Sequence, residues 1–347
     1  MKIALITDTH YNFKKASKVF HEYFAKFYND IFFPYLEEND IKTVIHLGDA
    51  FDNRKGIDYW ALKWAKENVY DKIESLGIEL YSIVGNHDTY FKNTNLVNSN
   101  ETLLGEYQNI VKISSPKEFT IGGTRLAFIP WICKDNQNEV FDFIENTQAK
   151  VAFGHFELSG FIVFPGQYQK NGLDKSILQK FDKVYSGHYH TPSDDGKIFY
   201  IGNPYQMFWN DLNDKRGFTI FDTETLETEF IENPYTIFER VYYEDSDYKK
   251  LDTEILNGKI VKVVVRKKTD IKNFEKFIDK ISNSNIVELK IIENLDIYDE
   301  DVEYSEEEFE DTLKILNKYI EESGFDLNKE KVKKIIGEIY SEALELE

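Results

Sequence analysis

The chain has 347 residues, 41% of them apolar and 15% aromatic, so it can bury a substantial core and exceeds the length of one ordinary domain. Its single cysteine, Cys133, excludes an intramolecular disulfide and a thiolate zinc cluster, so any metal must be held by His, Asp, Glu or Asn. The net charge of −20 neither establishes nor excludes DNA as a partner, because residues 293–347 contain 19 acidic and 6 basic residues and leave only −7 for the rest.

The first two-thirds of the chain alternate short apolar runs with helix-like stretches, which is typical of parallel β-α units. Helices are expected over residues 16–35 and 58–76, with Gly77 in the position of a helix C-cap. Buried strands are expected at residues 3–7, 43–47, 80–84, 151–153 and 183–186, and further strands at 125–130, 198–201 and 217–222. The sequence therefore predicts an α/β domain in which a second sheet packs on the first.

The character of the sequence changes after about residue 235. Residues 259–267, 271–282 and 286–292 predict a compact β-α-β unit, which is too small for much of a core and is expected as a cap beside the main domain. Two amphipathic helices follow an acidic stretch, the first opened by a capping box of Ser305 and Glu308. They either pack on their own domain or fill the groove of a partner. We expect a main domain at 1–235, a cap at 236–295 and an acidic, helical segment at 296–347.

The first residues of the chain indicate where in the cell the protein is expected. An apolar strand begins directly after Met1 and Lys2, without a charged leader or a cleavage site, and no apolar run is long enough to span a bilayer. We expect a soluble, cytoplasmic protein without a membrane partner.

Polar motifs directly follow each of the five predicted buried strands. They are Asp8-Thr9-His10, Gly48-Asp49, Gly85-Asn86-His87-Asp88, Gly154-His155 and Gly187-His188-Tyr189-His190. Open α/β sheets usually bind their ligands outside the carboxyl ends of their strands, and glycine beside a ligand lets the backbone turn sharply there. One such motif is a weak signal, since a lone histidine is more often structural, but five together predict a shared site. His21 and His46 lack this context and are assigned structural roles.

The donor types in these motifs indicate which metals would bind. Carboxylate, amide and imidazole groups without thiolate suit Mn²⁺, Fe²⁺ or Zn²⁺, whereas Mg²⁺ tolerates so many imidazoles poorly. Seven side chains also exceed the needs of one ion. Two ions about 3.5–4 Å apart that share a bridging carboxylate would use them all, and such pairs catalyse phosphoester hydrolysis.

These motifs, with Asp52 after Gly48-Asp49, resemble the signature of the calcineurin-like metallophosphoesterases over about residues 1–205. Within that superfamily the chain most resembles the SbcD-type nucleases of double-strand-break repair, in particular the recombination nuclease subunits of tailed phages, through residues 48–52, Pro130-Trp131 and residues 154–160. The resemblance implies a two-sheet β-sandwich flanked by helices, with the cap and a helical tail appended. It also implies the metal ligands: Asp8, His10 and His190 for one ion, Asn86, His155 and His188 for the other, and Asp49 as the bridge.

The same resemblance places His87 beside the scissile phosphate, where it would stabilise the transition state or protonate the leaving oxygen. Such a role needs a partner that holds its tautomer and raises its pKa. Asp52 is the first candidate for that partner. Asp88 is the alternative, although it could serve only to fix the loop.

Six polar residues just past the motifs are candidates for contacts with DNA phosphates, or are ordinary surface residues: Lys14, Lys15, Asn53, Arg54, Lys92 and Asn93. The chain departs from the family pattern at Tyr11-Asn12, where a small residue is usual, and at Gly202-Asn203-Pro204 in place of Gly-Ser. Neither departure touches a predicted ligand, so we expect them to affect the shape of the substrate groove.

The expected function is a DNA nuclease with exonuclease and endonuclease activity, using two Mn²⁺ ions with Mg²⁺ as a weaker substitute, in end processing, recombination and repair. The resemblance further implies an SbcC-like coiled-coil ATPase bound by the C-terminal helices, and a nuclease homodimer within a heterotetramer. Two alternatives stay open. One is a phosphatase or small-molecule phosphodiesterase of the same superfamily, and the other is a non-catalytic subunit that anchors the ATPase on DNA.

Overall fold

The computed structural model describes residues 1–164, 167–293, 331–333 and 335. The chain divides into two compact units, residues 1–297 and 298–347. Apart from residues 331–333 and 335, the predicted C-terminal helices and their capping box lie outside the described residues. Within the described part of the chain, no helix has both the length and the apolarity to cross a bilayer.

The first sheet has six strands in the order β16-β15-β1-β2-β3-β6. Their bounds are β1 Lys2–Ile6, β2 Thr43–His46, β3 Glu79–Ile83, β6 Ile110–Ile113, β15 Gly217–Asp222 and β16 Thr228–Glu232. β1, β2, β3 and β6 are parallel, whereas β15 and β16 are antiparallel additions beside β1. Side chains alternate between two buried faces, so that Ala4 and Ile6 contact the helical layer and Ile3 and Leu5 contact the second sheet.

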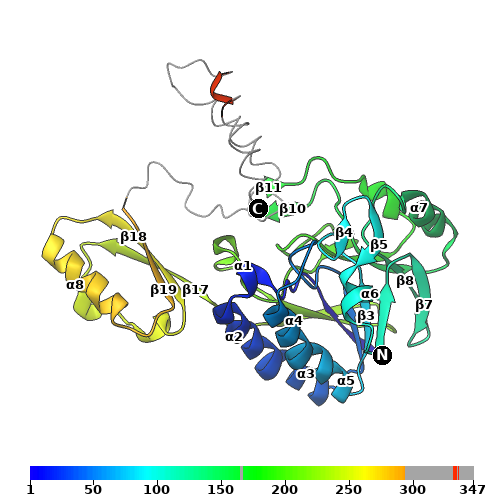
Figure 1. Ribbon diagram of the computed structural model, residues 1–347, viewed down its shortest axis with the longest axis horizontal. Helices are drawn as coiled ribbons and strands as arrows, with labels where there is room; N and C mark the ends of the chain where they lie inside the picture. Colours follow the sequence, from blue (N-terminus) through cyan, green and yellow to red (C-terminus); the bar gives the residue numbers. More distant parts are fainter. Residues whose placement is uncertain (165–166, 294–330, 334, 336–347) are drawn as a thin grey trace. The chain divides into compact units, whose positions relative to one another are not determined.

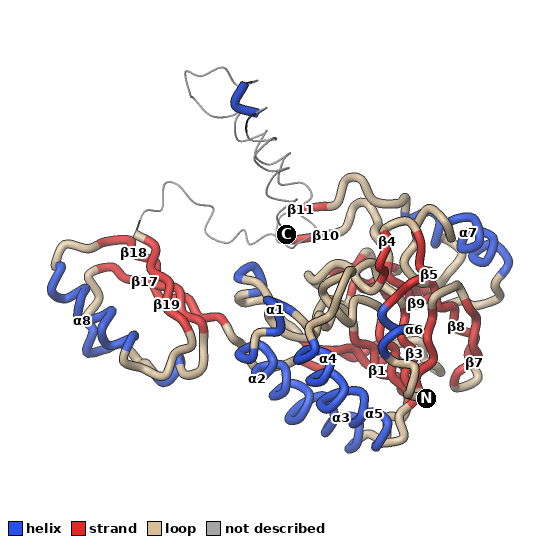
Figure 2. Tube along the Cα trace, viewed as in Figure 1, coloured by secondary structure: helices blue, strands red, loops and turns tan. Residues whose placement is uncertain are grey.

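The second sheet also has six strands, in the order β13-β14-β12-β9-β8-β7. Their bounds are β7 Lys117–Ile121, β8 Thr124–Ile129, β9 Val151–His155, β12 Lys183–Gly187, β13 Ser193–Asp194 and β14 Ile198–Tyr200. Phe128 and Phe153 pack against the first sheet, while Ala127 and Ala152 contact the layer that holds α7 (Gln137–Asn146) and η3 (Lys175–Leu178). The predicted two-sheet sandwich flanked by helices is therefore confirmed (Figure 2).

The five predicted buried strands are present, but they do not belong to one sheet. β1, β2 and β3 lie in the first sheet and β9 and β12 in the second. The edge that carries the polar motifs is therefore formed by the strand ends of both sheets, which face each other across the sandwich core.

Both long predicted helices form beside the first sheet, and each is interrupted by a π-helical turn. The segments are α2 Lys18–Phe27, η1 Tyr28–Phe32 and α3 Phe33–Glu38, then α4 Tyr59–Ala65, η2 Lys66–Tyr70 and α5 Asp71–Ser75 (Figure 1). The side chain of Asp58 caps α4 by accepting from the N–H of Trp60, and Gly77 ends the second helix at φ +62°. Before α2, the short α1 (Phe13–Ala16) contains left-handed residues, because Lys14, Lys15 and Ala16 all have positive φ.

The predicted β-α-β unit is present as β18 Ile260–Lys267, α8 Ile271–Ser282 and β19 Glu288–Ile292. The structure adds a third parallel strand, β17 Phe238–Glu244, which pairs with β18. α8 packs Phe274, Phe277 and Ile281 on this sheet in a small separate core. The boundaries predicted for the main domain and the cap stay predictions.

The remaining elements lie in the connections between strands of the two sheets and of the cap. They are β4 Thr89–Phe91, β5 Thr94–Asn98, α6 Ser99–Leu103, β10 Ile162–Phe164, β11 Gln167–Tyr168, η4 Trp209–Asp211, η5 Tyr248–Lys250 and η6 Glu254–Leu256. β4 and β5 form an antiparallel hairpin, as do β10 and β11.

Candidate active site

The first group of predicted ligands lies where β1 and β12 end. Nε2 of His10 lies 3.2 Å from Nε2 of His190, and these two nitrogens lie 4.0 and 3.8 Å from Oδ1 of Asp8. All three residues are buried or nearly so. Two imidazole nitrogens and a carboxylate oxygen that converge from separate sheets suit a divalent cation.

The second group lies where β2, β3, β9 and β12 end. Oδ1 of Asn86 lies 2.8 Å from Nε2 of His155 and 3.0 Å from Nδ1 of His188, and Oδ2 of Asp49 lies 3.1 Å from Nε2 of His155. The structure thus brings the seven predicted ligands into two donor groups, with Asp49 in the second group. That Asp49 bridges the two ions stays a prediction.

Hydrogen bonds from the backbone fix the orientation of several ligands. Nδ1 of His155 lies 2.8 Å from the carbonyl of Leu47, so this nitrogen donates and Nε2 is left to face the donor group. The carboxylate of Asp8 accepts from the N–H of His188 at 3.1 Å. Oδ1 of Asp49 accepts from the N–H of His87 at 2.9 Å, while Oδ2 faces His155. The donor groups are therefore held in place by the protein itself.

The backbone of the site adopts conformations that most residues avoid. Asp8, His10, Asp49 and His188 have φ values of 50°, 42°, 58° and 89°. Glycines pack closely on this backbone: a Cβ on Gly85 would overlap Oδ1 of Asp49, and one on Gly187 would overlap the hydroxyl of Thr7 and approach the carboxylate of Asp8. The glycines beside the ligands are thus required by close packing as well as by the turn.

His87 contacts Asp52 through the backbone of Asp52. Nδ1 of His87 lies 2.5 Å from the backbone carbonyl of Asp52, to which it donates. The carboxylate of Asp52 faces His10 instead, with Oδ1 3.2 Å from Nδ1, although the approach is not aligned for a regular hydrogen bond. The Asp52 carboxylate also lies near His87, because one oxygen of it and ring nitrogens of His10 and His87 all fall within 4.8 Å of one another, so the role of Asp52 as the partner of His87 stays a prediction.

Asp88, the alternative partner of His87, holds the loops together. Oδ2 accepts from the N–H groups of Asp49 and Gly85 at 2.8 and 2.9 Å, and Oδ1 accepts from the N–H of Ala50 and the hydroxyl of Ser99 at 3.2 and 2.9 Å. Burial, with the nearby charge of Asp49, raises the pKa of Asp88 to about 6. These contacts support the loop-fixing role that the sequence left open.

The charges of the second donor group are strongly coupled. Burial alone would lower the pKa of His155, but the neighbouring carboxylate of Asp49 outweighs this effect and raises the pKa to about 9. Burial works against the charge of Asp49 as well, and yet His155, followed by His87, holds the pKa of this carboxyl well below its usual range. The carboxylate of Asp49 thus stays ionised although it is buried, as a metal ligand must.

Comparison with known proteins agrees with this geometry. Residues 1–192 match the calcineurin-like phosphoesterase family. The chain is a calcineurin-like phosphoesterase. It is 33% identical to exonuclease subunit 1 of enterobacteria phage T4 over 287 residues, which cover 82% of each chain. This relationship agrees with the resemblance to phage recombination nucleases.

Solved structures show weaker likeness to the phosphoesterase. An archaeal phosphodiesterase is 16% identical and aligns over 67% of this chain and 100% of its own, with a TM-score of 0.35. A dimetal phosphatase from Danio rerio is 12% identical over 63% of this chain and 91% of its own, with a TM-score of 0.41. The family assignment rests on the sequence comparisons.

Aromatic side chains and one arginine contact the predicted ligands of the phosphoesterase and are not among the residues that the sequence predicts for the site. The ring of Trp131 lies 5.3 Å from that of His188 and 6.1 Å from that of His155, and Phe208 stacks on His190 at 6.0 Å. The buried guanidinium of Arg216 donates to the carbonyl of His190. Pro130-Trp131 belongs to the family resemblance alone, and no local pattern marks Phe208 or Arg216.

The two departures from the family pattern are explained by loop packing. The side chain of Asn12 accepts from the N–H of Asp52, and that of Asn203 accepts from Arg216. The hydroxyl of Tyr11 lies 2.9 Å from that of Tyr28 in the core. These residues therefore hold the loops that carry ligands; an effect on the substrate groove stays a prediction.

The six candidates for DNA contacts lie at the surface or close to it. Lys14, Lys15, Asn53, Lys92 and Asn93 are exposed and Arg54 is partly buried. Their positions allow contact with a phosphate chain, and that role stays a prediction for each.

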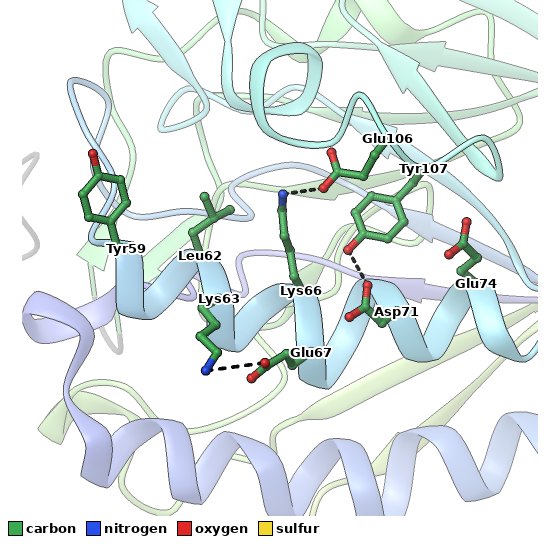
Figure 3. Close-up of a pocket in the computed structure, with 9 residues that line it drawn as sticks. All are labelled: Tyr59, Leu62, Lys63, Lys66, Glu67, Asp71, Glu74, Glu106 and Tyr107. Atoms are coloured by element: carbon green, nitrogen blue, oxygen red, sulfur yellow. Dashed lines mark hydrogen bonds and ion pairs between the residues drawn. The ribbon is translucent and has the colours of Figure 1, made fainter.

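A hollow of about 580 Å³ runs along α4 and α5 and holds none of the predicted ligands. Most of its charged groups are paired: Lys63 with Glu67, Lys66 with Glu106, and Asp71 with the hydroxyl of Tyr107 (Figure 3). This lining does not combine histidine, carboxylate and amide groups as the two donor groups do.

Proposed function

We propose that this phosphoesterase is a two-metal DNA nuclease, acting as exonuclease and endonuclease in end processing, recombination and double-strand-break repair. The observation that carries the proposal is the pair of donor groups, one of Asp8, His10 and His190 and one of Asn86, His155, His188 and Asp49. DNA as the substrate is supported by the exonuclease name of the phage T4 relative, which matches 82% of this chain.

Two divalent cations, when bound, stabilise charge on the attacking and leaving oxygens of a phosphoester. The protein's own part is to place His87 beside them. The Asp52 carbonyl accepts from Nδ1 of His87, which leaves Nε2 for the phosphate or the leaving oxygen. We propose Mn²⁺ as the preferred ion, with Mg²⁺ weaker, because imidazole supplies four of the seven ligands.

The test is release of nucleotides from end-labelled linear duplex DNA in Mn²⁺, in Mg²⁺ and in EDTA. The matched control is Asp49→Asn, which keeps the size of the side chain and removes its charge. Digestion that requires Mn²⁺ and is lost in the control supports the proposal. If DNA stays intact while bis(p-nitrophenyl) phosphate is hydrolysed, the chain is a small-substrate phosphoesterase. If both stay intact, it is an ATPase-dependent or non-catalytic subunit.

We also propose an SbcC-like ATPase as the partner, bound through residues 305–346, and a homodimer of the nuclease within the complex. The relative's description as a subunit supports an assembly. The binding segment lies almost wholly outside the described residues. A chain that ends at Asp301 should keep simple nuclease activity and lose the ATPase; a truncated chain that still co-purifies with the ATPase refutes this assignment.

A further inference from the structure

The β4–β5 hairpin reverses the usual burial of polar and apolar side chains. Thr89, Asn95 and Asn98 are buried, whereas the exposed fractions of Tyr90, Phe91 and Leu96 are 42%, 49% and 84%. A single exposed apolar residue needs no explanation, but a short hairpin with its polar side inward and its aromatic side outward does.

The hairpin is fixed to the loop that carries the predicted catalytic residue. At one end, the hydroxyl of Thr89 donates to the carbonyl of Asn86 at 3.0 Å. Just past the other end, the N–H of Ser99 donates to the carbonyl of Asp88 at 2.8 Å. Asp88 also holds the Asp49 loop, so the hairpin and the donor groups share one anchor.

A third hydrogen bond attaches the hairpin to Trp131, the aromatic residue beside the predicted ligands. Nδ2 of Asn95 donates to the carbonyl of Trp131 at 2.9 Å, and the Trp131 ring lies 5.3 Å from that of His188. The exposed rings of Tyr90 and Phe91, 4.7 Å apart and edge to face, are therefore held at a set position relative to the site.

The charge of the hairpin suits a polyanion. Residues 89–100 contain one lysine, Lys92 in the turn, and no acidic residue, in a chain with 62 acidic side chains. A phosphate chain would thus meet no repulsion from this segment, unlike much of the acidic surface.

We propose that Tyr90 and Phe91 form a stacking platform for unpaired bases of the DNA strand whose phosphate lies at the donor groups. Bases within a duplex already stack on each other, so the platform selects single strands and frayed ends. This inference rests on the proposed nuclease function and names its substrate class. Phe91 is four residues past His87, roughly 13 Å along an extended chain, so the stacked base lies within about four nucleotides of the scissile phosphate.

The experiment compares Tyr90→Ala/Phe91→Ala with Leu96→Ala, which removes an exposed apolar side chain of the same hairpin without removing a ring. Steady-state digestion is measured on a single-stranded oligonucleotide, on a duplex with four unpaired end nucleotides and on a fully paired blunt duplex. We expect the double variant to raise KM for the first two substrates roughly 5- to 100-fold. This is the change in affinity expected when a base loses its stacking on an aromatic ring. Leu96→Ala should change KM by less than about twofold.

A direct reading of stacking comes from 2-aminopurine placed at successive positions of the single strand. In the His87→Gln background, fluorescence should be quenched at one or two positions near the scissile bond, and the quenching should disappear in the double alanine variant. All variants are first checked for an unchanged thermal midpoint.

Three outcomes refute the platform. Equal KM values for the wild type and the double variant refute it while leaving the nuclease intact. An equal loss with Leu96→Ala, together with a change of oligomeric state in sedimentation, assigns the hairpin to contact with a second copy of the chain. If the wild type itself digests no DNA, the proposed function fails and the inference fails with it.

Discussion

The carboxylate of Asp52 lies against His10, with 3.2 Å between Oδ1 and Nδ1, while the carbonyl of the same residue accepts from His87. One residue thus contacts a predicted metal ligand through its side chain and the predicted catalytic histidine through its backbone. A substitution at Asp52 therefore affects the first contact and spares the second.

Asp52→Asn should weaken binding of the ion held by His10, by about 10- to 100-fold, because an outer carboxylate orients a ligand imidazole and raises its basicity. Mn²⁺ titration by calorimetry measures this change, with Asn53→Ala as the exposed neighbouring control. If turnover falls and both Mn²⁺ affinities stay at their wild-type values, the carboxylate serves His87 after all.

His87→Gln should lower turnover by about 10²- to 10⁴-fold, the usual contribution of a general acid or of one transition-state donor. Metal binding should survive, because the contact with Asp49 is made by the backbone N–H of residue 87. Stoichiometry of bound Mn²⁺ and single-turnover cleavage are measured on the same sample. Loss of one ion in the variant would contradict the assignment of His87 as a residue that is not a ligand.

Because of His46, the free energy of unfolding should fall as the pH drops below about 6.5. The N–H of Gly48 donates to Nδ1 of this buried imidazole, so Nε2 carries the proton and donates to Thr9. Burial lowers the pKa of His46 to about 3, against 6.5 in the unfolded chain. The unfolded state binds the extra proton below pH 6.5, so the stabilisation is complete above that pH and is lost as the pH falls towards 3.

Between pH 7 and pH 5 this effect amounts to about 2 kcal/mol of unfolding free energy. Urea unfolding of the wild type and of His46→Asn at both pH values isolates it, because the other titrating groups are common to both proteins. If the unfolding free energy falls equally in both proteins between pH 7 and pH 5, His46 is not the group that causes the fall.

Arg216→Gln should destabilise the fold by about 3–5 kcal/mol, because it leaves the buried carboxylate of Asp211 without its partner. The guanidinium lies 2.9 Å from Oδ1 of Asp211 and also bonds the carbonyl of His190. The neighbouring Lys215→Gln removes only an exposed pair with Glu232 and should cost no more than about 1 kcal/mol. Equal denaturation midpoints for the two variants would contradict this account.

Local pattern was enough to predict the strands and the polar motifs that follow them, whereas the assignment of these side chains as metal ligands came from the family resemblance and stays a prediction. Parallel strands end at a common edge, so a motif directly after a buried strand can be placed without knowing its neighbours. The division of the strands between two sheets could not be predicted this way, because an apolar run such as residues 151–153 fits either sheet equally well. β17 was missed because charged Glu239 and Arg240 interrupt its apolar alternation.

The missed parts of the site depend on contacts between residues far apart in sequence. The orientation of Asp52 is set partly by Asn12, which accepts its N–H from 40 residues away. Arg216 reaches His190 across 26 residues, and Trp131, which follows β8, lies near the donor groups where β8 pairs with β9. No periodicity or spacing encodes such pairings.

The left-handed backbone at Asp8, His10, Asp49 and His188 affects how mutagenesis of this protein can be interpreted. Alanine in that conformation costs roughly 1–2 kcal/mol, whereas Asn, Asp and His tolerate it better. An inactive alanine variant at position 8 or 49 would therefore combine loss of a donor with a reshaped loop. Asparagine leaves the turn as it is and removes only the charge, so the amide variants are those from which the electrostatic contribution of each carboxylate can be read.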